Sequence, residues 1–212
     1  LSQEDFVSSA TCKSCHPGEY HSWHSSFHRT MTQPATRENV RGDFHDIELT
    51  KFGHTCRLTQ RSDEYWVEMT DPLWFGQESR SRPANPPRIK TRIVMVTGSH
   101  HLQTYWIRRP SDPSAYLRPD DGALLQLPWV WLIEEQRWVA TEDSFLSPPI
   151  SNPENLVPWN TSCNMCHSVG TQPHLESTRY NSQTADLGIA CEACHGPGAA
   201  HVRANQSPLA RY

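Results

Sequence analysis

The sequence lacks a long apolar run, an excess of basic residues and a full share of hydrophobic side chains. No stretch of its 212 residues approaches the roughly 20 apolar positions that a membrane-spanning helix needs. The formal net charge of −4 excludes the basic footprint of a nucleic-acid-binding protein. Hydrophobic residues make up 36% of the chain, so we expect a bound apolar group to supply part of the core. The sequence therefore predicts no stable membrane insertion and no nucleic-acid partner.

The cysteines are the most informative feature of the sequence. Six of the seven form three Cys-x-x-Cys pairs, and histidine follows each pair directly, at residues 12–16, 163–167 and 191–195. Two thiols three residues apart lie on one turn and can each add to a vinyl group of a haem, while the adjacent histidine binds the iron. The pattern predicts three haems c, with thioether bonds from Cys12, Cys15, Cys163, Cys166, Cys191 and Cys194 and proximal iron ligands His16, His167 and His195.

Two other kinds of site use Cys-x-x-Cys pairs. The pairs at 163/166 and 191/194 have the spacing of a four-cysteine zinc ribbon, but that interpretation leaves the first pair without a role and three histidines unexplained. A thioredoxin-like dithiol needs a βαβ context, which the sequence does not indicate. Haem c accounts for all three motifs.

The seventh cysteine, Cys56, has no partner in this pattern. It lies in an alternating stretch, residues 54–58, that predicts a strand. A buried free thiol that acts as a small hydrophobic residue is the preferred interpretation. An intermolecular disulfide and a metal site shared with His54 stay open as alternatives.

The positions of the motifs divide the chain into three segments. Residues 1–36 hold the first haem motif, residues 37–150 hold none and residues 151–212 hold the other two. The predicted fold class is a mixed, irregular multihaem cytochrome, with short helices around three haems and a β-rich middle module.

Local patterns place the expected elements. Residues 88–95 alternate apolar and charged side chains with period 2, which predicts a strand with one buried face. Residues 56–59 and 65–69 flank a polar tip, which predicts a hairpin. Short helical turns are predicted over residues 12–20 and 23–31.

The haem motifs are embedded in longer patterns. Aromatic, serine and histidine positions follow the first motif up to His28, and the third motif lies in residues 188–201 as Cys-Glu-x-Cys-His-Gly-Pro-Gly-x-x-His. Both patterns resemble multihaem cytochromes of the cytochrome c554 superfamily. Residues 98–105, with two adjacent histidines, are similar to multihaem proteins that often carry tetratricopeptide repeats further along. No such repeat occurs in these 212 residues.

The resemblance also implies the second ligand of each iron. Nine of the twelve histidines lie outside the three motifs, and the family patterns point to His28, His101 and His201 as distal ligands. His100 is the main alternative to its neighbour His101 as a distal ligand, and His174 is a further candidate. Methionine is the competing ligand, but the chain has only four. Ligation by two histidines implies low-spin iron with no open position for a substrate.

The spacing of His201 suggests which iron it binds. It follows His195 by six residues, beyond a Gly-Pro-Gly bend. A tight loop would be needed to reach the opposite face of the same haem, so we expect His201 to bind the iron of a neighbouring haem. The same argument applies less strongly to His28 after His16. Such cross-ligation would make metal binding part of folding.

Three six-coordinate haems in one small chain indicate electron transfer rather than an enzyme, because the protein then supplies ligation, burial and spacing. Expected partners are other redox proteins or identical subunits, including a homopolymer that forms a conductive filament. The alternative is an oxidoreductase that acts on a small nitrogen or sulfur species at one open haem, as the resemblance implies for some relatives. The surplus of histidine disfavours it, and a gas sensor would also need an open iron.

The haem motifs and the first residue predict the compartment. The resemblance implies that haem is attached on the outer side of the bacterial cytoplasmic membrane. The chain begins at Leu1 rather than methionine, which indicates a processed N-terminus after removal of an export signal. We therefore expect a periplasmic or extracellular protein.

Overall fold

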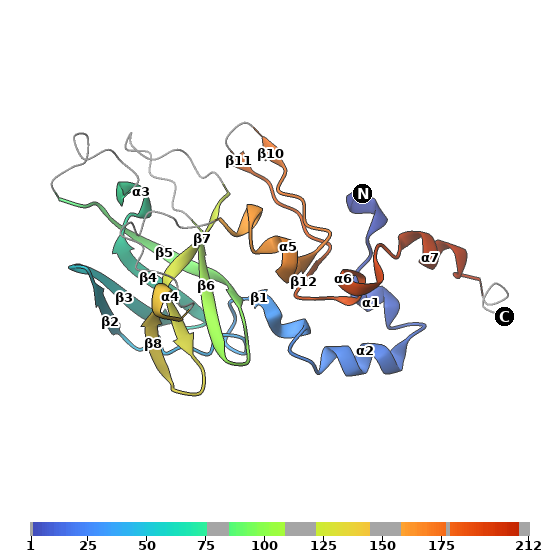
Figure 1. Ribbon diagram of the computed structural model, residues 1–212, viewed down its shortest axis with the longest axis horizontal. Helices are drawn as coiled ribbons and strands as arrows, with labels where there is room; N and C mark the ends of the chain where they lie inside the picture. Colours follow the sequence, from blue (N-terminus) through green and yellow to red (C-terminus); the bar gives the residue numbers. More distant parts are fainter. Residues whose placement is uncertain (1, 76–84, 109–121, 145–157, 177–178, 208–212) are drawn as a thin grey trace. The chain divides into compact units, whose positions relative to one another are not determined.

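The chain folds into two compact units, one continuous and one made from both chain ends. The computed structural model (Figure 1) describes residues 2–75, 85–108, 122–144, 158–176 and 179–207. The continuous unit runs from Gln33 to Trp159, and the two-ended unit combines residues 1–32 and 160–212. No helix of the described residues is long and apolar enough to cross a membrane. The segment boundaries expected after residues 36 and 150 stay predictions.

The continuous unit is built on a twisted antiparallel sheet (Figure 1). From β2 to β8 each strand is hydrogen-bonded to the next in chain order, and β1 pairs with β5. The strands are β1 (Thr32–Pro34), β2 (Ile47–Lys51), β3 (His54–Arg61), β4 (Glu64–Thr70), β5 (Arg88–Thr97), β6 (Leu102–Arg108), β7 (Leu124–Leu132) and β8 (Arg137–Ala140). Two short helices, α3 (Pro72–Phe75) and α4 (Thr141–Ser144), follow β4 and β8.

The predicted strand and hairpin are both confirmed. Residues 88–95 lie in β5, where exposed and buried positions alternate up to Ile93. Strands β3 and β4 form the hairpin, which the pair Arg61 and Glu64 closes, with Ser62 at φ +53° in the turn. Because successive strand side chains face opposite sides, this alternation gives the sheet an apolar face.

Aromatic side chains fill the core of this unit. The ring of Phe44 packs against those of Tyr65, Tyr105 and Trp138 at centroid distances of 5.0, 5.4 and 5.5 Å. The Tyr105 hydroxyl accepts a hydrogen bond from Gly42 N (2.8 Å). Burial raises the pKa of Tyr105, so the phenol stays neutral. The continuous unit therefore closes a core with its own side chains.

The two-ended unit has little apolar core. Its described buried apolar side chains are Val169, Ala190 and Ala199. Such a unit needs another source of apolar contact to fold. Its elements are η1 (Gln3–Asp5), α1 (Ser9–Cys12), α2 (Pro17–His24), η2 (Arg29–Met31), η3 (Trp159–Thr161, at the boundary), α5 (Asn164–His167), β9 (Ser168–Val169), β10 (Leu175–Glu176), β11 (Arg179–Tyr180), β12 (Asp186–Leu187), α6 (Cys191–His195) and α7 (Ala199–Ala204).

The helical turns predicted over residues 12–20 and 23–31 are wrong in their bounds. Helix α1 ends at Cys12, and α2 begins at Pro17, because a proline lacks the N–H that an inner helical turn would use and fits the first position of a new helix. Helix α2 ends at His24, before the separate turn η2. The break between α1 and α2 leaves His16 at the N-cap of α2.

Cys56 is the one cysteine outside the three haem motifs, so a count of free thiols tests how many cysteines carry haem. Its side chain is 4% exposed in β3, and burial raises its pKa to about 12, so little thiolate exists near neutral pH. We expect no reaction of the native holoprotein with Ellman's reagent near neutral pH. Unfolding in guanidinium should release one reactive thiol per chain, because the three motifs predict that haem occupies the other six cysteines. Cys56→Ser should abolish this signal. A native reaction would contradict the burial, and extra thiols would contradict full haem attachment.

Candidate functional site

Each Cys-x-x-Cys-His motif forms a single helical turn. His16 N donates a hydrogen bond to Cys12 O (2.9 Å), and His167 N donates to Cys163 O (3.0 Å). The third motif is helix α6, which ends at His195. Cysteines three positions apart share one face of such a turn. This is the arrangement that two thioether bonds to one porphyrin require.

The first and third motifs lie side by side in the two-ended unit, where α1 packs against α6. Burial and the neighbouring thiol of Cys191 raise the pKa of Cys12. Ser9 N donates to the carboxylate of Asp186 (2.9 Å), which ties α1 to the segment that leads into α6. Motifs from opposite ends of the chain therefore form one site.

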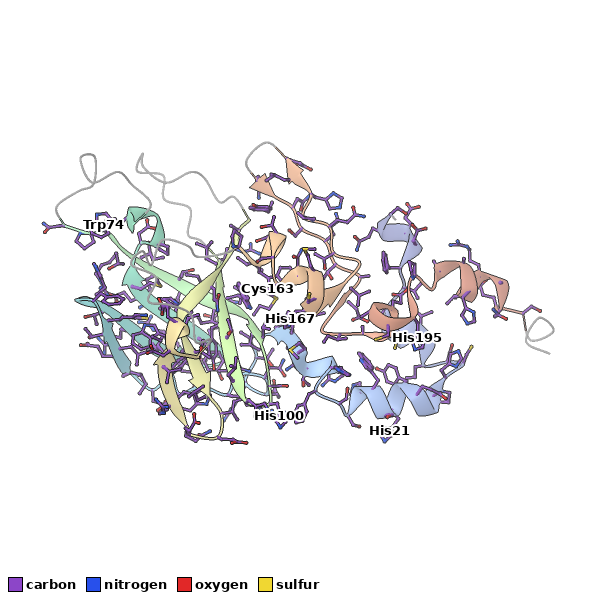
Figure 2. All side chains as sticks on the ribbon, viewed as in Figure 1. His21, Trp74, His100, Cys163, His167 and His195 are labelled. Atoms are coloured by element: carbon purple, nitrogen blue, oxygen red, sulfur yellow. The ribbon has the colours of Figure 1, made fainter. Side chains whose placement is uncertain are left out.

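A cavity of about 600 Å³ adjoins these two motifs. Its volume lies in the range of cofactor sites. The motif cysteines Cys12, Cys191 and Cys194 line this cavity. Four histidines also line it: His16, His28, His195 and His201. His21 does not line it, and Figure 2 shows the His21 side chain on the side of α2 away from His195.

The imidazole rings of His16 and His201 approach each other at this cavity. Their centroids are 6.3 Å apart, and their planes differ by 29°. Two imidazoles on opposite sides of one metal ion, each bound at about 2 Å, place their nitrogens about 4 Å apart and their ring centres roughly 6 Å apart. The observed spacing therefore fits two axial ligands of one iron.

The backbone holds His28 beside the third motif. Its carbonyl oxygen accepts a hydrogen bond from Ile189 N (2.9 Å). Gly188 permits this close approach, because its φ of +81° favours glycine and a Cβ there would overlap Arg29 O. His28 and the proximal His195 thus line the same cavity from different ends of the chain.

The second motif occupies the turn around α5, where Figure 2 labels Cys163 and His167. Strand β9 pairs with β12, and Gly188 N donates to His167 O (3.1 Å), so α5 is anchored to the segment before α6. Burial lowers the pKa of His167, which favours the neutral imidazole that binds metals. Among the described residues its buried Nδ1 has no hydrogen-bond partner.

The structure brings two of the three expected distal ligands, His28 and His201, to the cavity. His101 lies in the continuous unit, in the turn between β5 and β6, where its ring stacks on that of His100 with centroids 3.9 Å apart. Both rings are exposed, and the reserve His174 is exposed just before β10. The distal ligand opposite His167 therefore stays a prediction.

Glu192 is a site residue whose role the sequence analysis missed. Its side chain is 7% exposed and accepts hydrogen bonds from Val7 N (3.0 Å) and Gly198 N (2.6 Å). The Cys-Glu-x-Cys-His pattern contains this residue. However, glutamate is almost never fully buried unless it is paired, so the pattern alone gave no reason to expect its burial.

Comparison with known proteins agrees with this chemistry. Residues 148–196, which contain the second and third motifs, match the family described as cytochrome c554 and c-prime. No curated protein matches the chain. The crystal structure of the outer cell wall cytochrome OcwA has a similar fold, with a TM-score of 0.54 and 18% identity over 95% of this chain and 34% of that chain. These findings support a multihaem c-type cytochrome.

The family match over residues 148–196 agrees with the haem c expected at the second and third motifs. The mixed fold class is confirmed, with short helices in one unit and a β-rich sheet in the other. The chain spans about a third of the length of the cytochrome that it matches in fold. The number of haems and the link to tetratricopeptide proteins stay predictions.

Substitution of Gly188 tests how tightly the segment around His28 is held. Gly188→Ala should lower the thermal unfolding midpoint of the holoprotein, because alanine at positive φ costs about 1–2 kcal/mol and its Cβ would overlap Arg29 O. Gly18→Ala is the matched control, since Gly18 lies in α2 with open space around its Cα. Calorimetry of both variants measures the difference. Equal midpoints would contradict the close approach at Gly188.

Proposed function

We propose that this chain is a trihaem electron-transfer cytochrome in which two histidines bind every iron. The six cysteines of the motifs would hold the porphyrins, with proximal ligands His16, His167 and His195 and distal ligands His28, His101 and His201. Two of the three ligand pairs would each join the two ends of the chain: His16 would pair with His201, and His195 with His28.

The 6.3 Å separation of the His16 and His201 rings is the observation that carries this proposal. The two residues come from opposite ends of the sequence, yet they have the spacing of two axial ligands on one metal ion. The same cavity also receives His28 and His195. Four histidines at one cavity supply two pairs of ligands and leave neither iron with an open position.

The residues of the chain determine how the site works. Bound haem c supplies one-electron Fe(III)/Fe(II) chemistry. Histidines on both faces of each ring keep substrates from the metal. The neighbouring thiols of Cys12 and Cys191 would attach two porphyrins at adjacent edges, which suits electron exchange between them.

We place the protein outside the cytoplasmic membrane, in the periplasm or beyond the cell. Covalent haem supports export, and the name of the similar cytochrome locates that protein in an outer cell wall. The partners would be other redox proteins or identical subunits, including a filament as a homopolymer. Sedimentation and electron microscopy of the purified holoprotein distinguish a filament from a monomer.

Haem content and carbon monoxide binding test the proposal directly. The intact mass should equal that of the chain plus three haem groups. Carbon monoxide added to the dithionite-reduced holoprotein should leave the Soret spectrum nearly unchanged, because every iron has two histidine ligands. A wild-type haem that binds the gas would overturn the proposal and favour an oxidoreductase with one open iron.

Removal of His201 should open one specific iron. His201→Ala should convert one haem per chain to a high-spin form that binds carbon monoxide, since His16 would then lack its partner. His21→Ala is the matched control, because His21 does not line the cavity. Absorption and electron paramagnetic resonance spectra of both variants measure the effect. If His201→Ala behaves like the wild type, His201 is not an axial ligand.

A further inference from the structure

We infer that Glu192 is the positioning residue that directs His201 to the iron bound by the first motif rather than to that of its own motif. The inference rests on the proposed ligation by histidine pairs. It concerns a side chain inside the third motif that neither carries haem nor binds metal.

The contacts of Glu192 join three parts of the two-ended unit. Oε1 accepts hydrogen bonds from Val7 N (3.0 Å) and Gly198 N (2.6 Å), and Oε2 also accepts from Val7 N (3.0 Å). Val7 precedes the first motif by a few residues, and Gly198 closes the Gly-Pro-Gly bend. One carboxylate therefore fixes the entry to α1, the third motif and the loop that leads to His201.

The loop geometry makes this restraint effective. Gly196 ends α6 at φ +75°, and Val202 N donates to Gly198 O (2.9 Å) in the first turn of α7. Gly198 thus connects to Glu192 through its N–H and to α7 through its carbonyl group. Because His201 lies in the first turn of this short helix, the direction in which α7 leaves the bend sets the position of the imidazole.

The burial of Glu192 makes these hydrogen bonds hard to replace. The carboxylate is almost fully shielded from water, and it pairs with no basic side chain of the described residues. The hydrogen bonds from Val7 N and Gly198 N therefore compensate the carboxylate for its lost hydration. Hydrogen bonds to a charged group are stronger than those between neutral groups. Without Glu192, Val7 N and Gly198 N would lose this common acceptor, and α7 could leave the bend in other directions.

Glu192→Met in the holoprotein is the principal test, because methionine keeps the length of the side chain and removes the oxygens that accept from Val7 N and Gly198 N. Asp186→Leu is the matched control, because it likewise replaces a carboxylate by an apolar side chain of similar size. Asp186 also accepts an N–H from the N-terminal segment, that of Ser9 (2.9 Å), but it forms no hydrogen bond with the Gly-Pro-Gly bend. The His201→Ala spectrum provides the reference for an opened His16 haem.

We expect Glu192→Met to retain its full haem content while its carbon monoxide-binding fraction rises by roughly tenfold, with the spectrum of His201→Ala. Asp186→Leu should stay at the wild-type level. Glu192→Met at the wild-type level would overturn the inference, as would an equal rise in both variants, since anchoring of the N-terminal segment would then suffice. Carbon monoxide binding by the wild type would instead refute the proposed function itself.

A second variant decides the matter if Glu192→Met fails to assemble. Glu192→Asp retains the carboxylate but is one methylene shorter, so it cannot reach Val7 N and Gly198 N together. The inference expects the same opened His16 haem in Glu192→Asp. A spectrum like that of the wild type would show that the span between the two donors is not needed, and would overturn the inference.

Discussion

The main constraint on the two-ended unit is its small apolar core, because the apolar side chains that it buries among the described residues are Val169, Ala190 and Ala199. Burial of apolar surface is the main favourable term in folding. The continuous unit satisfies this requirement with the aromatic cluster around Phe44. The two-ended unit instead surrounds a cavity of about 600 Å³ with cysteine and histidine. Porphyrin faces in such a cavity would serve as core as well as redox centre.

This requirement explains why the ends of the chain meet. The direct links between them include the hydrogen bonds from Val7 to Glu192, from Ser9 to Asp186 and from Ile189 to His28. Each contributes only about 1 kcal/mol net to stability, and closing a loop of most of the chain costs conformational entropy. The proposed iron ligation across the two ends would supply additional free energy, because metal binding to a site absent from the unfolded chain is coupled to folding.

The sequence predicted those features that depend on residues close together in the chain. The three motifs fix the cofactor, since attachment needs only five consecutive residues, and alternation located β5 and the β3–β4 hairpin. The helix bounds near Pro17 were wrong because period and composition did not capture the break before a proline. The approach of the His16 and His201 rings could be anticipated only as a need for cross-ligation. Which histidine meets which motif depends on contacts such as that of Gly188 with His28, which involve residues far apart in the chain.

The proposed cross-ligation would also favour electron transfer over catalysis on physical grounds. A histidine that follows its own motif closely can dissociate by local fraying, which would open the iron to small molecules. His28 O instead accepts from Ile189 N before the third motif, and the bend before His201 shares the Glu192 carboxylate with Val7 N before the first motif. With the proposed ligation, the same contacts that complete the fold of this unit would keep its irons six-coordinate. A fold that closes its metal centres in this way suits a relay, in which electrons enter through porphyrin edges while no substrate reaches the metal.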